Sequence, residues 1–323
     1  MTSDSFPRLL GDIGGTHARF AWQDRSDAEP SALATYLCAE YETPLAAIRQ
    51  YLAEHGHGKA RWCAIGIANP VTGDRVQMTN HHWSFSISQL RQDLALERLV
   101  VINDFTALAL SLPVLDASEL RQIGRGTPTT GAAIAVLGAG TGLGVSGLVP
   151  APGGVLVPIN GEGGHVTLAA DNEMEAAVVQ HLRQRFGHAS AERALSGPGL
   201  VNLYEAACAL TGKEPLVLRP AEVITHARDG TEPGCAEALQ LFCGLLGSVA
   251  GNLALTLGAR GGVYIGGGIA PRMLAEIEGS SFRARFEAKG RFERYLRDIP
   301  TLVITTETSP ALIGASRALD IDG

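Results

Sequence analysis

A carboxylate and an amide stand side by side in an otherwise apolar stretch, LVVINDFTALAL (residues 99–110). Burying a carboxylate there is unfavourable unless it is paired, hydrogen-bonded or used in chemistry. Residues 99–102 are predicted as a buried strand, so Asn103 and Asp104 follow its carboxyl end, where α/β sheets bind ligands. Asp104 could act as the general base for a substrate hydroxyl, or the pair could supply the N-cap of the next helix. Position alone favours the cap.

Two glycine-rich turns join predicted strands, in GDIGGT (residues 11–16) and GAGTGLG (residues 138–144). Consecutive backbone N–H groups in such turns can form an anion-binding nest, and a threonine hydroxyl adds a donor. These turns could bind phosphate or could be tight hairpins only. A third glycine segment, IGGGIAP (residues 265–271), favours phosphate binding. No G-K-[ST] follows either turn, and Leu143 stands where a dinucleotide fingerprint needs Gly or Ala.

Asp12 lies within the first glycine turn in this interpretation. A carboxylate beside a phosphate site requires a divalent cation between the two negative groups, and Mg²⁺ favours few carboxylates together with phosphate oxygens. The alternative is an Asx-turn, in which Asp12 caps its own backbone.

Two further polar side chains are candidates for binding a polyhydroxylated ligand. Glu162 and His165 lie in the glycine-rich GEGGHV, where the glycines disfavour a helix and hence a helical metal site. The alternative is a solvated loop. Glu192, in HASAERALSGPG, is by itself best interpreted as an ordinary first-turn glutamate of a helix, favoured by the helix dipole.

Composition narrows the class of protein. The 323 residues are 46% hydrophobic with a net charge of −7, which is globular and argues against nucleic acid or an anionic membrane as a partner. Five scattered cysteines fit a reducing cytoplasm and form no sequence-local zinc site. The polar first seven residues predict no signal peptide. Residues 241–259 are apolar and are interpreted as a buried helix with small residues, rather than a membrane span.

Alternating strand and helix patterns predict an α/β fold with parallel strands. The strand, glycine turn and strand of residues 8–22 recur at residues 132–149, and residues 118–130 are expected to be a connection. The recurrence suggests two related α/β domains facing each other across a cleft, with chance similarity of glycine-rich turns as the alternative.

Taken in order, these stretches resemble the bacterial glucokinase family of the sugar kinase/hsp70/actin superfamily. The resemblance covers nearly the whole chain and depends on the joint order of its motifs. The matching segments are GDIGGTHARF, NPVTGD, MTNHHWSFS, INDFTA, GAGTGLG, GEGGHV, SAERALSGPGLVNLY, GNLALTLGARGGVYIGGGIAPR and FRARFEAKGRF.

The resemblance implies two actin-like, ribonuclease H-like α/β domains around a central cleft. The small domain would comprise residues 1–113 with 303–323, completed by the C-terminal helix, and the large domain residues 114–302. Asp104 would be the catalytic base, and Asn103, Asp104, Glu162, His165 and Glu192 would bind the sugar. The ATP site would comprise Gly11, Asp12, Ile13, Gly14, Gly15, Thr16, Gly138, Gly140, Thr141, Gly142, Gly266, Gly267 and Gly268.

The implied activity is transfer of the γ-phosphoryl group of ATP to the 6-hydroxyl of glucose, with Mg-ATP as donor and glucose and ATP as the partners of a cytoplasmic homodimer. No zinc is expected, because the C-x-C-G-x-x-G-C motif of the related repressor/open-reading-frame/kinase group does not follow His165. A sugar-binding sensor without catalysis and an NAD-dependent oxidoreductase are the alternatives. The intact Asp104 and the failed dinucleotide fingerprint argue against them.

Overall fold

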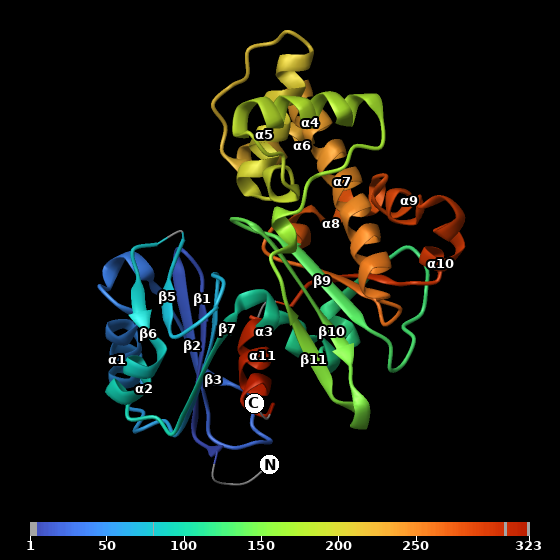
Figure 1. Ribbon diagram of the computed structural model, residues 1–323. Helices are drawn as coiled ribbons and strands as arrows, with labels where there is room; N and C mark the ends of the chain where they lie inside the picture. Colours follow the sequence, from blue (N-terminus) through green and yellow to red (C-terminus); the bar gives the residue numbers. More distant parts are fainter. Residues whose placement is uncertain (1–4, 80, 307–308, 322–323) are drawn as a thin grey trace. The chain divides into compact units, whose positions relative to one another are not determined.

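The computed structural model describes residues 5–79, 81–306 and 309–321 (Figure 1). The chain divides into two compact units, here called the small unit (Met1–Asp116 with Thr306–Gly323) and the large unit (Ala117–Thr305). Each has a sheet and hydrophobic cores of its own. The exact domain limits expected above, 1–113 with 303–323 and 114–302, stay a prediction.

The small unit is built on a five-stranded sheet of order β3-β2-β1-β4-β7. Strands β3, β2 and β1 are antiparallel, whereas β1, β4 and β7 run parallel. The strands are β1 (Arg8–Ile13), β2 (His17–Gln23), β3 (Ser31–Leu37), β4 (Trp62–Ile67) and β7 (Arg98–Asn103), and a separate hairpin pairs β5 (Arg75–Gln77) with β6 (Ser84–Ser86).

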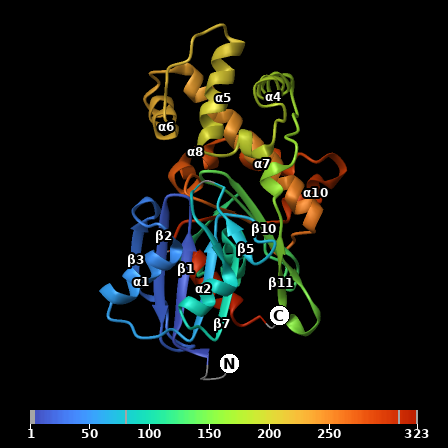
Figure 2. The same cartoon turned by 60° about the vertical axis from the view of Figure 1, so that its left-hand side comes forward.

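Alternate residues of these strands face two different cores. Leu9 packs into the core that includes Ile48 and Tyr51 of helix α1 (Pro44–Glu54), while Leu10 packs against Leu312 of helix α11 (Pro310–Ala318). Helices α1 and α2 (Ile87–Asp93) cover one face of the sheet, and α3 (Asp104–Ser111) and α11 cover the other (Figures 1 and 2). The C-terminal helix thus completes the small unit, as expected.

Helices α3 and α11 approach each other closely. A Cβ atom on Gly314 of α11 would overlap the carbonyl oxygen of Ala107 in α3, so only glycine fits. On the sheet side, a Cβ on Gly66 would lie 3.1 Å from the Cβ of Ala107 and 3.6 Å from the Cα of Asp104. Glycines on both sides therefore define the position of α3.

The large unit contains a six-stranded sheet of order β11-β10-β9-β12-β13-β8. Strands β9, β12 and β13 are parallel, and β10, β11 and β8 join them antiparallel. The strands are β8 (Leu120–Ile123), β9 (Ile134–Ala139), β10 (Leu143–Pro150), β11 (Leu156–Asn160), β12 (Val263–Gly266) and β13 (Thr301–Ile304).

The helices of the large unit gather around the long α7 (Pro233–Leu257), which packs against β9, α5, α6 and α9 (Figure 2). Among the described residues α7 is the one helix long and apolar enough to span a membrane, but 72% of its most apolar window is buried. It is the expected core helix, ending two residues before Ala259. The other helices are α4 (Glu173–Phe186), α5 (Gly197–Leu210), α6 (Pro220–Asp229), α8 (Leu274–Gly279), α9 (Phe282–Glu287) and α10 (Glu293–Arg297).

The predicted fold class is confirmed, and both glycine turns connect antiparallel strands as expected. The shared strand order, β3-β2-β1-β4-β7 in one unit and β11-β10-β9-β12-β13 in the other, favours duplication over chance similarity. The expectation for residues 118–130 was wrong in part. Leu120–Ile123 forms the edge strand β8. Its two central residues, Arg121 and Gln122, are both polar and exposed, so the segment lacks the alternation of apolar and polar residues that predicts a strand.

We predict that Gly314→Ala destabilises the small unit by about 1–3 kcal/mol, because the added methyl group overlaps the Ala107 carbonyl and forces the two helices apart. The matched control is Gly58→Ala in the same unit, where a Cβ meets nothing within 4 Å and φ is not positive. Urea denaturation followed by tryptophan fluorescence measures both. An unchanged midpoint in Gly314→Ala would contradict this packing.

Candidate functional site

The parallel strands β1, β4 and β7 of the small unit end at the same level of the sheet. The register pairs Ile13 with Ile67 and Ile67 with Asn103, so the residues after β1, β4 and β7 lie along one edge of the sheet. That edge contains the turn Gly14–Thr16, Asn69 and Asp104. It is the edge at which α/β sheets bind ligands, as the position of Asp104 predicted.

Asn103, rather than Asp104, is the N-cap of α3. Its Oδ1 accepts hydrogen bonds from the backbone N–H groups of Phe105 (2.9 Å) and Thr106 (3.2 Å). Asp104 is the first helical residue, and its Oδ1 accepts from Asn103 Nδ2 (3.0 Å) and Phe105 N (3.0 Å). The positive end of the helix dipole favours a negative charge there. Asn103 thus supplies the cap, and the half-buried Asp104 carboxylate is oriented by the Asn103 side-chain amide and the Phe105 backbone N–H.

Asp12 lies in strand β1, opposite Arg19 of β2, so its expected position inside the turn was wrong. Its buried carboxylate accepts through Oδ2 from Arg19 (3.1 Å) and from the Ser309 hydroxyl (2.7 Å), and Oδ1 takes part in neither contact. An Asx-turn is therefore excluded. Sequence reasoning missed both partners: period-two pairing across the turn could have suggested Arg19, but nothing local links Asp12 to Ser309.

The expected ATP-binding set Gly11–Thr16 falls into two parts. Residues 11–13 are buried strand, and only Gly14–Thr16 form the turn. Gly14 N donates to the His17 carbonyl (2.9 Å), whereas the N–H groups of Gly15 and Thr16 have no hydrogen bond within the described chain. Those two donors are available to an anion.

Cys38 stabilises this turn through two contacts with its backbone. The Cys38 N–H donates to the Thr16 carbonyl (2.9 Å), and its Sγ lies 3.5 Å from the Gly14 carbonyl. Burial raises the pKa of the Cys38 thiol to about 11, so the group stays protonated at neutral pH and can donate to that carbonyl.

The two glycine segments of the large unit lie side by side. Gly138 in β9 pairs with Gly266 in β12, and a Cβ on Gly138 would overlap the backbone of Gly266. Gly267 has φ +80° and faces the Ala139 backbone. The exposed Thr141 stands at the tip of the first turn, and Gly268 follows β12. The two segments thus form one backbone surface at the carboxyl edge of the sheet.

Glu192 is tied to that surface. Its Oε2 accepts from the backbone N–H of Leu143 (2.9 Å) and lies against Gly142, while Gly197 N, at the start of α5, donates to the Gly140 carbonyl (2.8 Å). Glu192 does lie in the first turn of a short 3-10 helix, Ala191–Arg193, as its interpretation as a first-turn glutamate expected, but its carboxylate also binds the backbone of Leu143.

Backbone hydrogen bonds bring the segment that carries Glu162 and His165 close to the segment that carries Glu192. Residues 163–165 form a single 3-10 turn, and the next residues pair with the segment before Glu192: Leu168 N donates to the Ala189 carbonyl (2.9 Å) and Ala191 N to the Val166 carbonyl (2.9 Å). The side chains of Glu162 and His165 are exposed and make no hydrogen bond to other described residues. They can bind a ligand without first losing an internal partner.

The predicted residues therefore form two groups. Asp12, Gly14–Thr16 and Asn103–Asp104 share one sheet edge of the small unit, and Gly138–Gly142, Glu162, His165, Glu192 and Gly266–Gly268 gather in the large unit. Within the described residues no group of three or more His, Cys, Asp or Glu side chains is placed to hold a metal ion.

Comparison with known proteins identifies the family. The model of the family described as Glucokinase matches residues 9–321. The chain is 58% identical over 319 residues to a glucokinase of Aromatoleum aromaticum, covering 98% of this chain and 96% of the relative. The chain belongs to the glucokinase family.

Solved structures share the fold. A glucokinase from an Antarctic psychrotroph superposes with a TM-score of 0.88 at 37% identity, covering 97% of this chain and 98% of the other. A ROK family glucokinase from Streptomyces griseus, solved with glucose and AMPPNP, has a TM-score of 0.65 at 19% identity, with 97% and 99% covered. The family membership supports an ATP-dependent hexose kinase that phosphorylates glucose; neither the sensor nor the oxidoreductase is favoured.

We predict that Asn103→Ala lowers the free energy of unfolding by about 1 kcal/mol through loss of the cap. It also lowers kcat/KM for glucose by about 10²-fold, because Asp104 loses an orienting partner. Thr43→Ala is the control, since Thr43 caps α1 of the same unit by accepting from Ala46 N. It has a similar stability cost but should retain wild-type turnover. Equal kcat/KM losses in both variants would contradict a positioning role for Asn103.

Proposed function

We propose that Asp104 is the general base with which this chain phosphorylates the 6-hydroxyl of glucose. The observation that carries the proposal is the position of Asp104, at the carboxyl end of β7 and on the same sheet edge as the turn Gly14–Thr16. A Brønsted base must lie beside both the acceptor hydroxyl and the phosphate site.

In the proposed step, a carboxylate oxygen of Asp104 accepts the proton of the glucose 6-hydroxyl. The oxygen O6 forms a bond to the γ-phosphorus as the bond to the β,γ-bridging oxygen breaks, and ADP leaves with that electron pair. Most of the rate gain in phosphoryl transfer comes from positioning and from neutralising charge, and the protein supplies both through fixed backbone groups.

We propose that the sugar is held by Asn103, Glu162, His165 and Glu192. Carboxylates accept hydrogen bonds from ring hydroxyls, an imidazole can donate or accept, and the Asn103 amide adds a donor. The side chains of Glu162 and His165 have no hydrogen-bond partner among the described residues, and Glu192 has Oε1 left after Oε2 binds Leu143 N. A sugar lacking a matching hydroxyl would leave one of these groups unsatisfied, at about 1–3 kcal/mol.

We propose that the phosphates of ATP contact Gly14–Thr16 and Gly138–Gly142, and that Gly266–Gly268 line its adenosine side. The free N–H groups of Gly15 and Thr16 support the first assignment. The close pairing of Gly138 with Gly266, which brings the other two segments together, supports the second.

Magnesium fits the donors at Asp12. Arg19 and Ser309 occupy Oδ2 and leave Oδ1, and Mg²⁺ commonly takes one carboxylate with phosphate oxygens and water. We propose that Asp12 holds the ion of Mg-ATP, which when bound neutralises part of the triphosphate charge. The family resemblance further supports a role in glycolysis as a cytoplasmic homodimer, and five buried free cysteines are consistent with a reducing compartment.

We expect Asp104→Ala to lower kcat by about 10²–10⁴-fold, the usual contribution of a positioned general base, with a smaller effect on glucose affinity. Coupled ADP release gives kcat, and glucose-induced quenching of tryptophan fluorescence gives affinity. The control is Asp93→Ala, an exposed carboxylate of the small unit outside the site. Wild-type turnover by Asp104→Ala would overturn the assignment.

A further inference from the structure

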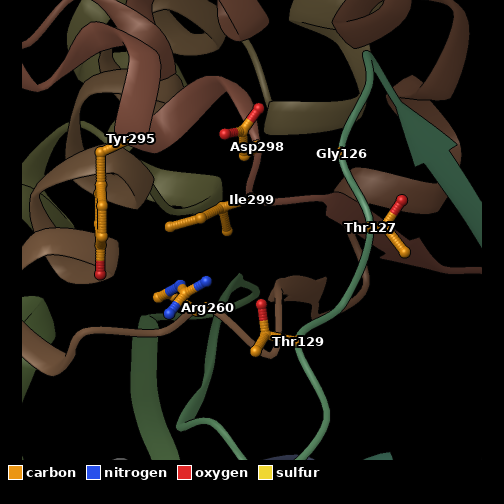
Figure 3. Close-up of a pocket in the computed structure, with 7 residues that line it drawn as sticks. All are labelled: Gly126, Thr127, Thr129, Arg260, Tyr295, Asp298 and Ile299. Carbon is orange, nitrogen blue, oxygen red and sulfur yellow. The ribbon is translucent and has the colours of Figure 1, made fainter.

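A cavity of about 450 Å³ opens in the large unit, away from every residue assigned above. Three segments line it: the link between β8 and β9, the link between α7 and β12, and the end of α10 with the residues before β13 (Figure 3). The lining residues are Gly126, Thr127, Thr129, Arg260, Tyr295, Asp298 and Ile299.

This cavity is separate from the proposed nucleotide segments of the same unit. Arg260 precedes β12 and Ile299 precedes β13, so the cavity lies at the amino ends of the parallel strands. Gly138–Gly142 and Gly266–Gly268 lie at the carboxyl ends. The four residues of β12 alone separate the two edges by roughly 13 Å. A ligand in the cavity would therefore not contact the nucleotide segments.

Backbone contacts hold the three lining segments of the cavity together. Thr127 N donates to the Asp298 carbonyl (3.2 Å) and Thr129 N to the Arg260 carbonyl (2.9 Å). Gly126, with φ +118°, passes so close to the backbone of residues 298–300 that a Cβ there would lie 2.7 Å from it. The three lining segments are thus joined to one another directly.

A partly buried arginine, Arg283, fixes the segment that carries Asp298 and Ile299. The guanidinium of Arg283 donates to the carbonyls of Ile299 (2.9 Å), Arg297 (2.9 Å) and Leu296 (3.3 Å). It also forms an ion pair with Glu287 (2.7 Å). The cavity is therefore preformed, which lowers the entropic cost of binding.

The donors that face the cavity suit an anion. The guanidinium of Arg260 and the hydroxyls of Thr129 and Tyr295 have no hydrogen bond or ion pair with other residues that the structure describes. In the view of Figure 3 the hydroxyls of Thr129 and Tyr295 lie on the same side of the cavity as the Arg260 guanidinium. The Asp298 carboxylate points away from that side. An arginine fork with two hydroxyls matches a carboxylate or phosphate group.

The rest of the lining combines the polar Thr127 and Asp298 with apolar groups. The side chain of Ile299 and the ring of Tyr295 are apolar and line the same cavity as the Arg260 guanidinium (Figure 3). We propose that the cavity binds a small organic anion, with its carboxylate or phosphate group on Arg260 and a compact apolar body against Ile299 and Tyr295. The site is independent of the catalytic assignment.

Isothermal titration calorimetry of the full-length wild-type chain with phenyl phosphate, benzoate and inorganic phosphate tests the proposal. We expect saturable binding of phenyl phosphate or benzoate, and whichever binds more tightly identifies the anionic group. Inorganic phosphate should bind at least about ten-fold more weakly, because it lacks the apolar body.

Arg260→Gln should weaken binding of the preferred probe by about ten-fold or more. Turnover of glucose should stay at the wild-type value, which also shows that the variant is folded. The control is Arg294→Gln, an exposed arginine of α10 that does not line the cavity and should bind as wild type does. No saturable binding, undiminished binding by Arg260→Gln, or equal binding of inorganic phosphate would overturn the proposal.

Discussion

The position of Asp104, the proposed general base, depends on a steric constraint around helix α3. Ala107 is enclosed by Gly314 of α11 on one side and by Gly66 of β4 on the other, where a methyl group would overlap or crowd it. The helix therefore starts directly at the end of β7, and its cap, Asn103, orients Asp104. A chain segment more than 200 residues away in sequence, α11, thus helps to fix the residue proposed to accept the substrate proton.

Backbone groups rather than lysine or arginine carry most of the proposed phosphate contacts. The chain has a net charge of −7, yet the N–H groups of Gly15 and Thr16 have no partner in the part of the chain that the structure describes, and Gly138 lies against Gly266 at a distance only glycine allows. Such donors are already oriented before the ligand arrives, so little reorganisation is needed during transfer. Arg19 instead pairs with Asp12, which keeps this carboxylate in a defined position on β1.

Local sequence patterns were sufficient for much of the fold and for the identity of the candidate residues. The apolar run before Asn103 predicted that Asn103 lies at a strand end, and the glycines after Ile13 predicted a turn at the end of another strand. Both predictions succeed because strand boundaries follow from short-range signals. The choice between the two cap candidates and the place of Asp12 within a strand depend on boundaries of one or two residues, which patterns do not resolve. The contacts of Ser309 with Asp12 and of Glu192 with Leu143 join distant segments, and no local pattern encodes them. Strand β8 was missed because its outward-facing residues are polar.

Phosphoryl transfer from ATP to the 6-hydroxyl of glucose is the reaction that the family membership supports. The most direct test incubates the wild-type chain with ATP, magnesium and one sugar at a time, glucose, mannose or fructose, and follows products by ³¹P NMR. We expect ADP to form only when glucose is present, together with an equal amount of the phosphate monoester at carbon 6 of the sugar. ADP formation that does not depend on sugar, or no turnover with any hexose by the folded protein, would contradict it.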